Sequence, residues 1–95
     1  MSTTLGAQPT LVTVVHAPAC HFCDDAEQAL IRLATEFAFT VQLVDADGPR
    51  GRTLMAACGA PMYPLILIDG AFFSFGRLPR KKLRKLLEAR AALVA

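Results

Sequence analysis

The chain has 95 residues, 54% of them hydrophobic, three cysteines and a formal net charge of +2 at neutral pH. This length allows one domain with its own core, and the composition excludes both a disordered chain and a disulfide-framework protein. No run approaches the eighteen apolar residues of a membrane span, and Met1 to Pro9 lacks the charged and apolar regions of a secretory signal. We expect a flexible N-terminus over residues 1–9, a single domain over residues 10–95 and a cytoplasmic protein.

The first half of the chain predicts a strand, a helix and a second strand. Residues 11–15 form a β-branched apolar run, and Pro18 ends it. From Phe22 onward, apolar residues recur every three or four positions, as on one face of a helix. This face contains Phe22, Ala26, Ala29, Leu30, Leu33 and Phe37. Residues 39–43 then alternate between apolar and polar side chains, which indicates a strand.

Glycine and proline divide the middle of the chain. Residues 45–52 contain two glycines and a proline, and we expect a loop there. A short helix is expected over residues 53–58, with Gly59 at its C-terminal end. Pro61 and Pro64 bracket the turn that follows.

The last third of the chain predicts a β-hairpin and a helix. Residues 65–68 are all apolar, as in a strand covered on both faces, and Asp69-Gly70 tolerates the positive φ angles of a tight hairpin. Residues 71–75 form the return strand, and a helix follows over about residues 79–92. Its inward residues are Leu83, Leu86, Leu87 and Val94. The element order β-α-β-α-β-β-α predicts an α/β fold, a four-stranded mixed sheet flanked by helices.

Cys20 and Cys23 lie where the first strand ends and the first helix begins. Their spacing places both sulfurs on one side of a helix, close enough to form a disulfide after a small adjustment. Backbone N–H groups and the dipole at a helix N-terminus would stabilise a Cys20 thiolate. We therefore predict that Cys20 attacks a substrate disulfide and that Cys23, more shielded in the helix, resolves the mixed disulfide.

The chain resembles the glutaredoxins over about residues 10–92. The similarity comprises a Cys-x-x-Cys after the first strand, a proline before the third strand, an apolar Asp-Gly hairpin and a late glycine. Residues 20–24, Cys-His-Phe-Cys-Asp, are more similar still to a bacterial glutaredoxin-like family whose site reads Cys-His-x-Cys-Asp. The resemblance implies a thioredoxin-like fold of the glutaredoxin type and a thiol–disulfide oxidoreductase.

The resemblance also implies which residues surround the cysteines. Pro64 would be a cis-proline that faces the cysteine pair, and the Tyr63 backbone would bind an extended substrate segment. Gly76 takes the position where glutaredoxins approach glutathione. The expected substrate-binding residues are His21, Phe22, Tyr63, Pro64, Gly76 and Arg77. The expected substrate is a protein or low-molecular-weight disulfide, and we expect no bound cofactor.

The chain departs from the glutaredoxin pattern in two segments and at one single residue. Residues 62–64 read Met-Tyr-Pro in place of Thr-Val-Pro, and residues 75–77 read Phe-Gly-Arg in place of Gly-Gly and an Asp. Ala17 replaces a lysine that usually precedes the nucleophile by three residues. Each change removes or reverses an expected contact with glutathione. The electron donor therefore stays open between glutathione, another low-molecular-weight thiol and a reductase.

Three further residues each have two interpretations. His21 could stabilise the Cys20 thiolate, or it could be a solvent-exposed residue with a small effect. His16 is expected at the surface, with a metal-ligand role beside Cys20 and Cys23 as the alternative. Cys58 is expected to be a buried, inert thiol, with glutathionylation as the alternative.

Basic residues are concentrated near the end of the chain. Seven of the ten basic residues lie between Arg77 and Arg90, while seven of the eight acidic residues lie elsewhere. The last helix is thus expected to form a cationic face on an acidic body. This face lacks the interleaved aromatic residues of a nucleic-acid site. We expect a solvated face, with docking of an acidic protein as the alternative, and a monomer that binds neither nucleic acid nor membrane.

Other functions could use the same features. The cysteine pair could hold a metal or an iron–sulfur cluster in a non-catalytic carrier. A ferredoxin-like copper chaperone would need the order β-α-β-β-α-β, which the loop and short helix over residues 45–59 oppose. A protein-binding module with a vestigial site has only the basic helix in its favour.

Overall fold

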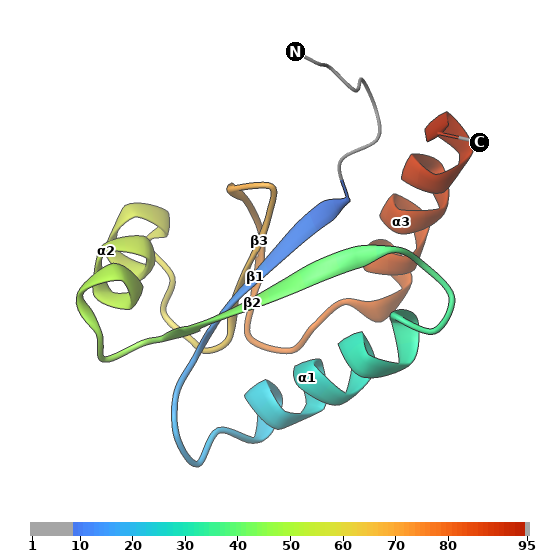
Figure 1. The fold of residues 1–95 in the computed structure, drawn as a ribbon. Coiled ribbons are helices and arrows are strands. Elements are labelled where there is room, and N and C mark those ends of the chain that lie inside the picture. The colour runs from blue at the N-terminus through green and yellow to red at the C-terminus, as the bar shows by residue number, and fades with distance from the viewer. Residues whose placement is uncertain (1–8, 95) are drawn as a thin grey trace.

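The structure is a computed structural model that describes residues 9–94 (Figure 1). The predicted flexible N-terminus falls outside the described residues, apart from Pro9. The element order is the predicted one. The elements are β1 (Thr10–His16), α1 (His21–Leu33), β2 (Phe39–Asp45), α2 (Pro49–Cys58), β3 (Leu65–Ile68), β4 (Ala71–Phe75) and α3 (Arg80–Val94). No helix in the described part of the chain is long and apolar enough to cross a membrane.

One mixed sheet organises the fold. The strand order is β2-β1-β3-β4, in which β1 and β2 are parallel and the other neighbours are antiparallel. α1 and α3 lie on one face of this sheet and α2 on the other (Figure 1). The predicted four-stranded mixed sheet is therefore confirmed, and the parallel pair is connected by the crossover helix α1, as such a pair requires.

The core consists of two clusters on opposite faces of the sheet. Val12 and Val14 of β1 pack with the buried residues of α1 and α3, whereas Val15 packs on the α2 side. This alternation is the period of two that an extended strand imposes. All four residues of β3 are at most 4% exposed, which confirms the prediction of a strand covered on both faces.

The predicted Asp-Gly hairpin is present between β3 and β4. Asp69 has φ 51° and Gly70 has φ 84°, both in the left-handed region that a two-residue hairpin turn requires. The Asp69 carboxylate accepts a hydrogen bond from the Leu11 backbone N–H at 2.9 Å and forms an ion pair with Arg90. The Arg90 hydrogen bond, and then the bond from Leu11, hold the pKa of Asp69 below its ordinary value.

The prediction of a loop over residues 45–52 is wrong in its second half. α2 begins at Pro49, with Gly48 as its N-cap, so only residues 46–48 connect β2 to α2. Proline is suited to the first helical position because the N–H it lacks would have no partner in the helix. The predicted C-terminal stop is correct, since Gly59 has φ 60°.

Two predicted burials and one predicted helix end need correction. Phe22 is 37% exposed, because helical side chains lean toward the N-terminus and a residue in the first turn extends beyond the helix end. Phe37 packs against the core from the segment after α1, which ends at Leu33. Cys58 is partly buried beside the α2 cluster rather than fully buried.

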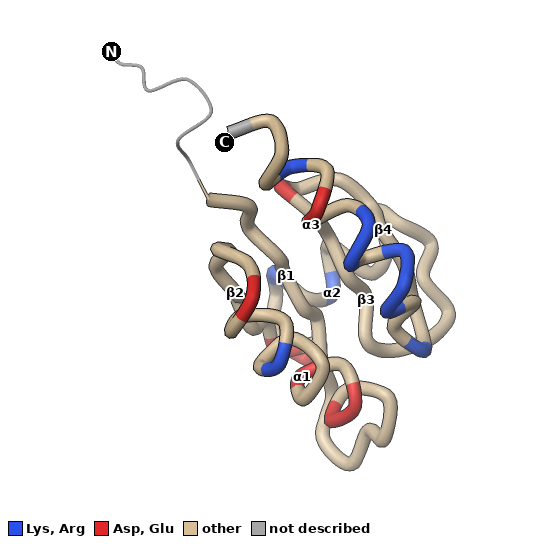
Figure 2. Tube along the Cα trace, turned by 90° about the vertical axis from the view of Figure 1, so that its right-hand side faces the viewer, with Lys and Arg blue, Asp and Glu red and all other residues tan. Residues whose placement is uncertain are grey.

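The basic face of α3 is partly neutralised by ion pairs, and the arginine side chains in these pairs stay 41–46% exposed. Basic positions run along α3, and acidic positions lie on α1 (Figure 2). Among the described residues, three ion pairs connect α3 to other parts of the chain, and each uses an arginine. The pairs are Arg80–Asp25, Arg84–Glu36 and Arg90–Asp69. The lysines at positions 81, 82 and 85 remain exposed.

Candidate functional site

Cys20 is the N-cap residue of α1. Its backbone is extended, with φ −110° and ψ 109°, and its sulfur accepts a hydrogen bond from the Cys23 backbone N–H at 3.1 Å. The sulfur thus occupies the place where a serine or aspartate oxygen caps many helices. A negative charge on this sulfur would face the positive end of the helix dipole.

A short turn brings the chain from β1 to Cys20. In this turn Ala19 has φ 52°, a left-handed conformation that is uncommon for any residue with a side chain. Such outliers concentrate at functional sites. The sequence pattern had not indicated Ala19, because backbone conformation at a single alanine leaves no periodic or compositional signal.

Cys20 and Cys23 are joined by a disulfide, with their Cα atoms 5.1 Å apart. Cys23 is 1% exposed, whereas Cys20 is partly exposed. The sulfur at the helix start is therefore the one that a substrate could approach. An attacking cysteine must be accessible to the substrate, whereas a resolving cysteine can be buried, and this difference fits Cys20 and Cys23 respectively.

The cis peptide that the resemblance implied is present between Tyr63 and Pro64. Antiparallel pairing of β1 and β3 extends to Val15 and Leu65, so Pro64 lies just beyond the last paired residues. It therefore lies at the sheet end where β1 leads into the turn before Cys20. Pro64 is fully buried and Tyr63 is 38% exposed.

Gly76 lies at the same end of the sheet, directly after β4. Its backbone N–H donates to the Pro64 carbonyl at 3.1 Å, which brings together two of the residues assigned to substrate binding. Gly76 has φ 75°, and a Cβ added there would lie 3.3 Å from the Met62 sulfur. Met62 thus packs across Gly76, and only a glycine combines this backbone conformation with that contact.

Exposed apolar side chains adjoin the cysteine pair and Pro64 along the chain: Phe22 lies between the cysteines, and Met62 and Tyr63 precede Pro64. We call Phe22, Met62 and Tyr63 the apolar rim; they are 37%, 44% and 38% exposed, respectively. Phe22 and Tyr63 were predicted as substrate-binding residues. The sequence indicates Met62 only as a departure from the glutaredoxin pattern. Its contact with Gly76 could not be predicted, because the two residues are 14 positions apart in the chain.

The charged candidates lie around the site in different ways. His21 is the exposed first residue of α1, and Arg77 is exposed after Gly76. His16 does not join the cysteines: its Nδ1 lies 3.8 Å from the Glu27 carboxylate, and both side chains are about one-third exposed. Over residues 9–94, no group of three or more His, Cys, Asp and Glu side chains is arranged to hold a metal ion.

Comparison with known proteins identifies the fold. No protein-family model and no curated protein matches the chain. Among solved structures, a thioredoxin variant from Halobacterium salinarum is 22% identical, with 87% of this chain and 75% of that chain covered and a TM-score of 0.65. A thioredoxin from Thermus thermophilus is 24% identical over 87% of this chain and 74% of that chain, with a TM-score of 0.55. The chain has a thioredoxin-like fold.

Proposed function

We propose that this protein is a thiol–disulfide oxidoreductase in which Cys20 is the nucleophile and Cys23 the resolving residue. One observation carries the proposal. The sulfur of Cys20 caps α1, accepts the Cys23 N–H and forms a disulfide with the buried Cys23. A thiolate in this position is stabilised by the helix N-terminus, and a second thiol is in place to displace it.

The reaction follows from this arrangement. In the reduced protein, the Cys20 thiolate attacks one sulfur of a substrate disulfide, forming a mixed disulfide and releasing the other sulfur as a thiolate that takes up a proton. Cys23 then loses its proton and attacks the Cys20 sulfur, which breaks the mixed disulfide and releases the second substrate thiol. The substrate gains two electrons and two protons, and the protein is left with the Cys20–Cys23 disulfide.

The apolar rim supports a protein or peptide disulfide as substrate. Phe22, Met62 and Tyr63 offer exposed apolar surface beside the cysteines, which favours substrate segments with apolar residues next to the disulfide. Glutathione carries two carboxylates, and Ala17 and Met62 stand where glutaredoxins contact it. We propose that a reductase or another thiol supplies the electrons, and that the protein works as a cytoplasmic monomer without a bound cofactor.

A redox titration combined with a turnover assay tests the proposal. The purified protein is equilibrated in glutathione buffers of increasing potential and its free thiols are counted. We expect one two-electron couple confined to Cys20 and Cys23. With dithiothreitol as reductant and a disulfide-bonded peptide as substrate, Cys20→Ser should lose at least about 100-fold in rate, while the matched variant Cys58→Ser retains the wild-type rate.

Two results would contradict this function. Full activity of Cys20→Ser would assign the chemistry to another group. Stoichiometric zinc or iron that survives gel filtration and protects both cysteines from alkylation would instead support the carrier function.

A further inference from the structure

A pocket of about 280 Å³ lies between α1 and α3. Four of its lining residues are basic and one is acidic, and its floor is apolar. The lining residues are Ala29, Arg32, Leu33, Glu36, Arg80, Lys81 and Arg84. Ala29 and Leu33 are only 3% and 7% exposed. The pocket thus has an apolar floor that is largely covered and a rim of excess positive charge, and it shares no residue with the cysteine site.

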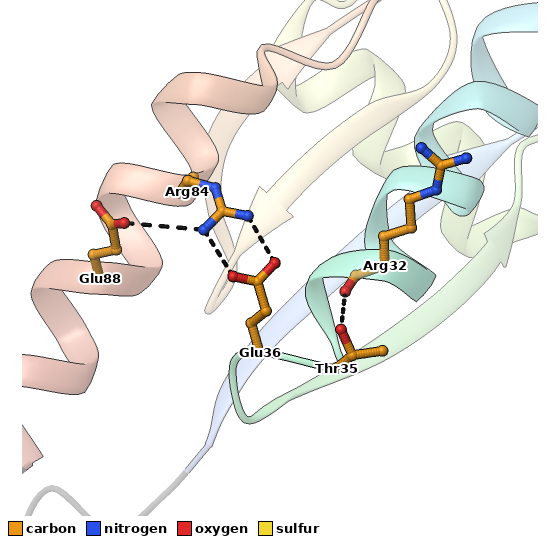
Figure 3. A network of polar contacts seen from close by, with 5 residues as sticks. All are labelled: Arg32, Thr35, Glu36, Arg84 and Glu88. Atoms are coloured by element: carbon orange, nitrogen blue, oxygen red, sulfur yellow. Dashed lines mark hydrogen bonds and ion pairs between the residues drawn. The ribbon is translucent and has the colours of Figure 1, made fainter.

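Two of the arginines hold the pocket walls in place. Arg84 donates to both oxygens of Glu36, at 3.0 and 2.8 Å (Figure 3). Its guanidinium also lies 5.5 Å from the centre of the Phe37 ring. At the other end of the pocket, Arg80 contacts Asp25 at 2.6 Å. Each pair connects α3 to α1 or to the segment after it. The walls are therefore preorganised, and the charges of these two arginines are already compensated.

Arg32 and Lys81 remain as uncompensated cations of the pocket. Within residues 9–94 neither side chain takes part in an ion pair, and Figure 3 shows the Arg32 guanidinium pointing away from Arg84. An anion placed between them would neutralise charge that the protein itself leaves exposed.

The first turn of α3 favours the same ligand. It contains the consecutive cations Arg80, Lys81 and Lys82 and no acidic residue, the reverse of what the helix dipole prefers. Arg80 is offset by Asp25, and Lys82 lies 5.0 Å over the Phe73 ring. Lys81 alone has no such compensation among the described residues. A charged residue that lowers the stability of its helix, and whose charge no other group of the protein offsets, is typical of a binding site.

We propose that this pocket binds a small organic anion, a carboxylate or phosphate ester, with its charged group between Arg32 and Lys81. The apolar part of the ligand packs on Ala29 and Leu33. The volume is at the lower limit for small-molecule sites, so it suits a ligand of about ten non-hydrogen atoms. The lining of the pocket as a whole is more apolar than polar, so an organic anion should bind there better than a free inorganic anion.

Amide NMR titration tests the site with defined probes. The wild-type protein is titrated with phenyl phosphate, benzoate, inorganic phosphate and the neutral benzyl alcohol. We expect at least one organic anion to saturate at about 1 mM or below, within reach of a ten-atom ligand. The shifted amides should include Ala29, Leu33 and Lys81. Inorganic phosphate and benzyl alcohol should bind at least about tenfold more weakly.

Matched variants decide whether the pocket is responsible. Arg32→Gln and Lys81→Gln should each weaken the organic anion about tenfold, as loss of one charged hydrogen bond predicts. Lys85→Gln removes the same charge from α3 outside the pocket and should leave binding unchanged. If all three variants weakened binding equally, the net charge of the protein and not the pocket would cause the binding, and the proposal would be wrong. It would also be wrong if neither organic anion saturated. Preference for carboxylate or for phosphate ester identifies the ligand class.

Discussion

Gly51 lies against the carbonyl oxygen of Asp45 so closely that a Cβ at position 51 would come within 2.0 Å of that oxygen. The same Cβ would lie 2.8 Å from the Ala46 Cα. Both obstacles are backbone atoms, which cannot move aside as a flexible side chain can. Gly51 thus allows α2 to pack against the end of β2.

Gly51→Ala should therefore destabilise the protein, although alanine is the better helix former. We expect the free energy of unfolding to fall by about 3 kcal/mol, because α2 must shift away from the sheet. Urea unfolding followed by circular dichroism measures this change. Gly59→Ala is the control: it has φ 60° and nothing within 4 Å of the added Cβ, so it should cost only about 1 kcal/mol. A wild-type stability for Gly51→Ala would mean that Gly51 does not lie against the Asp45 carbonyl.

This position also shows where prediction from the sequence ends. β3 and the Asp69-Gly70 turn could be predicted, because an apolar run and a turn dipeptide are local signals. The start of α2 could not, since Gly48, Pro49 and Gly51 together favour a loop in a single sequence, and the close approach of Gly51 to the Asp45 carbonyl leaves no local signal. Tertiary packing overrode local preference at this point.

In the candidate site, too, local features could be predicted from the sequence and long-range contacts could not. The cysteine pair and its place at a strand–helix junction could be read from adjacent residues. The packing of Met62 across Gly76 and the pairing of Arg84 with Glu36 could not, because their partners lie 14 and 48 residues away. No periodicity or spacing in a single sequence contains such contacts.

Asp69 should make the stability depend on pH. Its pKa lies below the ordinary value of 3.8 because of hydrogen bonds from Arg90 and Leu11. A carboxyl group whose pKa is lowered in the folded state stabilises the fold above that ordinary value, and the contribution is lost as the pH falls through the folded pKa. Asp69→Asn keeps the turn but removes the charge. Because the ion pair is nearly half-exposed, we expect a loss of about 0.5–1 kcal/mol at pH 7.

Urea unfolding at several pH values measures this dependence. The difference between wild type and Asp69→Asn should vanish as the pH falls over roughly 5 to 2. Asp69→Ala provides a contrast, because alanine at φ 51° adds a backbone cost of about 1 kcal/mol at every pH. If the loss in Asp69→Asn did not depend on pH, the carboxylate charge would not be its source.

Glu36 should titrate at low pH because of Arg84. The hydrogen bonds from the Arg84 guanidinium hold the pKa of Glu36 below its ordinary value of 4.5. Carbon chemical shifts of the Glu36 carboxyl group, followed by NMR from neutral pH to pH 2, measure it directly. Arg84→Gln should raise the pKa toward the ordinary value, whereas Arg52→Gln, which removes a cation that contacts the Asp47 carbonyl, should leave it unchanged. The pairing would be refuted by identical titrations in wild type and Arg84→Gln.

Cys23→Ser should trap the reaction at its midpoint. Without the Cys23 sulfur, nothing within the protein displaces the substrate from Cys20, so a mixed disulfide should accumulate. Mass spectrometry after incubation of the reduced variant with a disulfide-bonded peptide measures the adduct and its position. Cys20→Ser should form no comparable adduct, because Cys23 is 1% exposed. An adduct on Cys23 in that variant would reverse the assigned roles.

The apolar rim should determine which disulfides react well. Met62→Ser and Phe22→Ser each remove apolar surface beside the cysteines, and each should raise KM for a peptide disulfide with apolar flanking residues about fivefold. The value of kcat should stay near wild type, because neither side chain takes part in the chemical step. Turnover of bis(2-hydroxyethyl) disulfide, which is too small to cover the rim, should be unaffected. Ile31→Ser is the control, since Ile31 is 62% exposed more than two turns further along α1 than Phe22. If all three variants changed KM equally, or if the small disulfide were affected as strongly as the peptide, the rim would have no role in substrate choice.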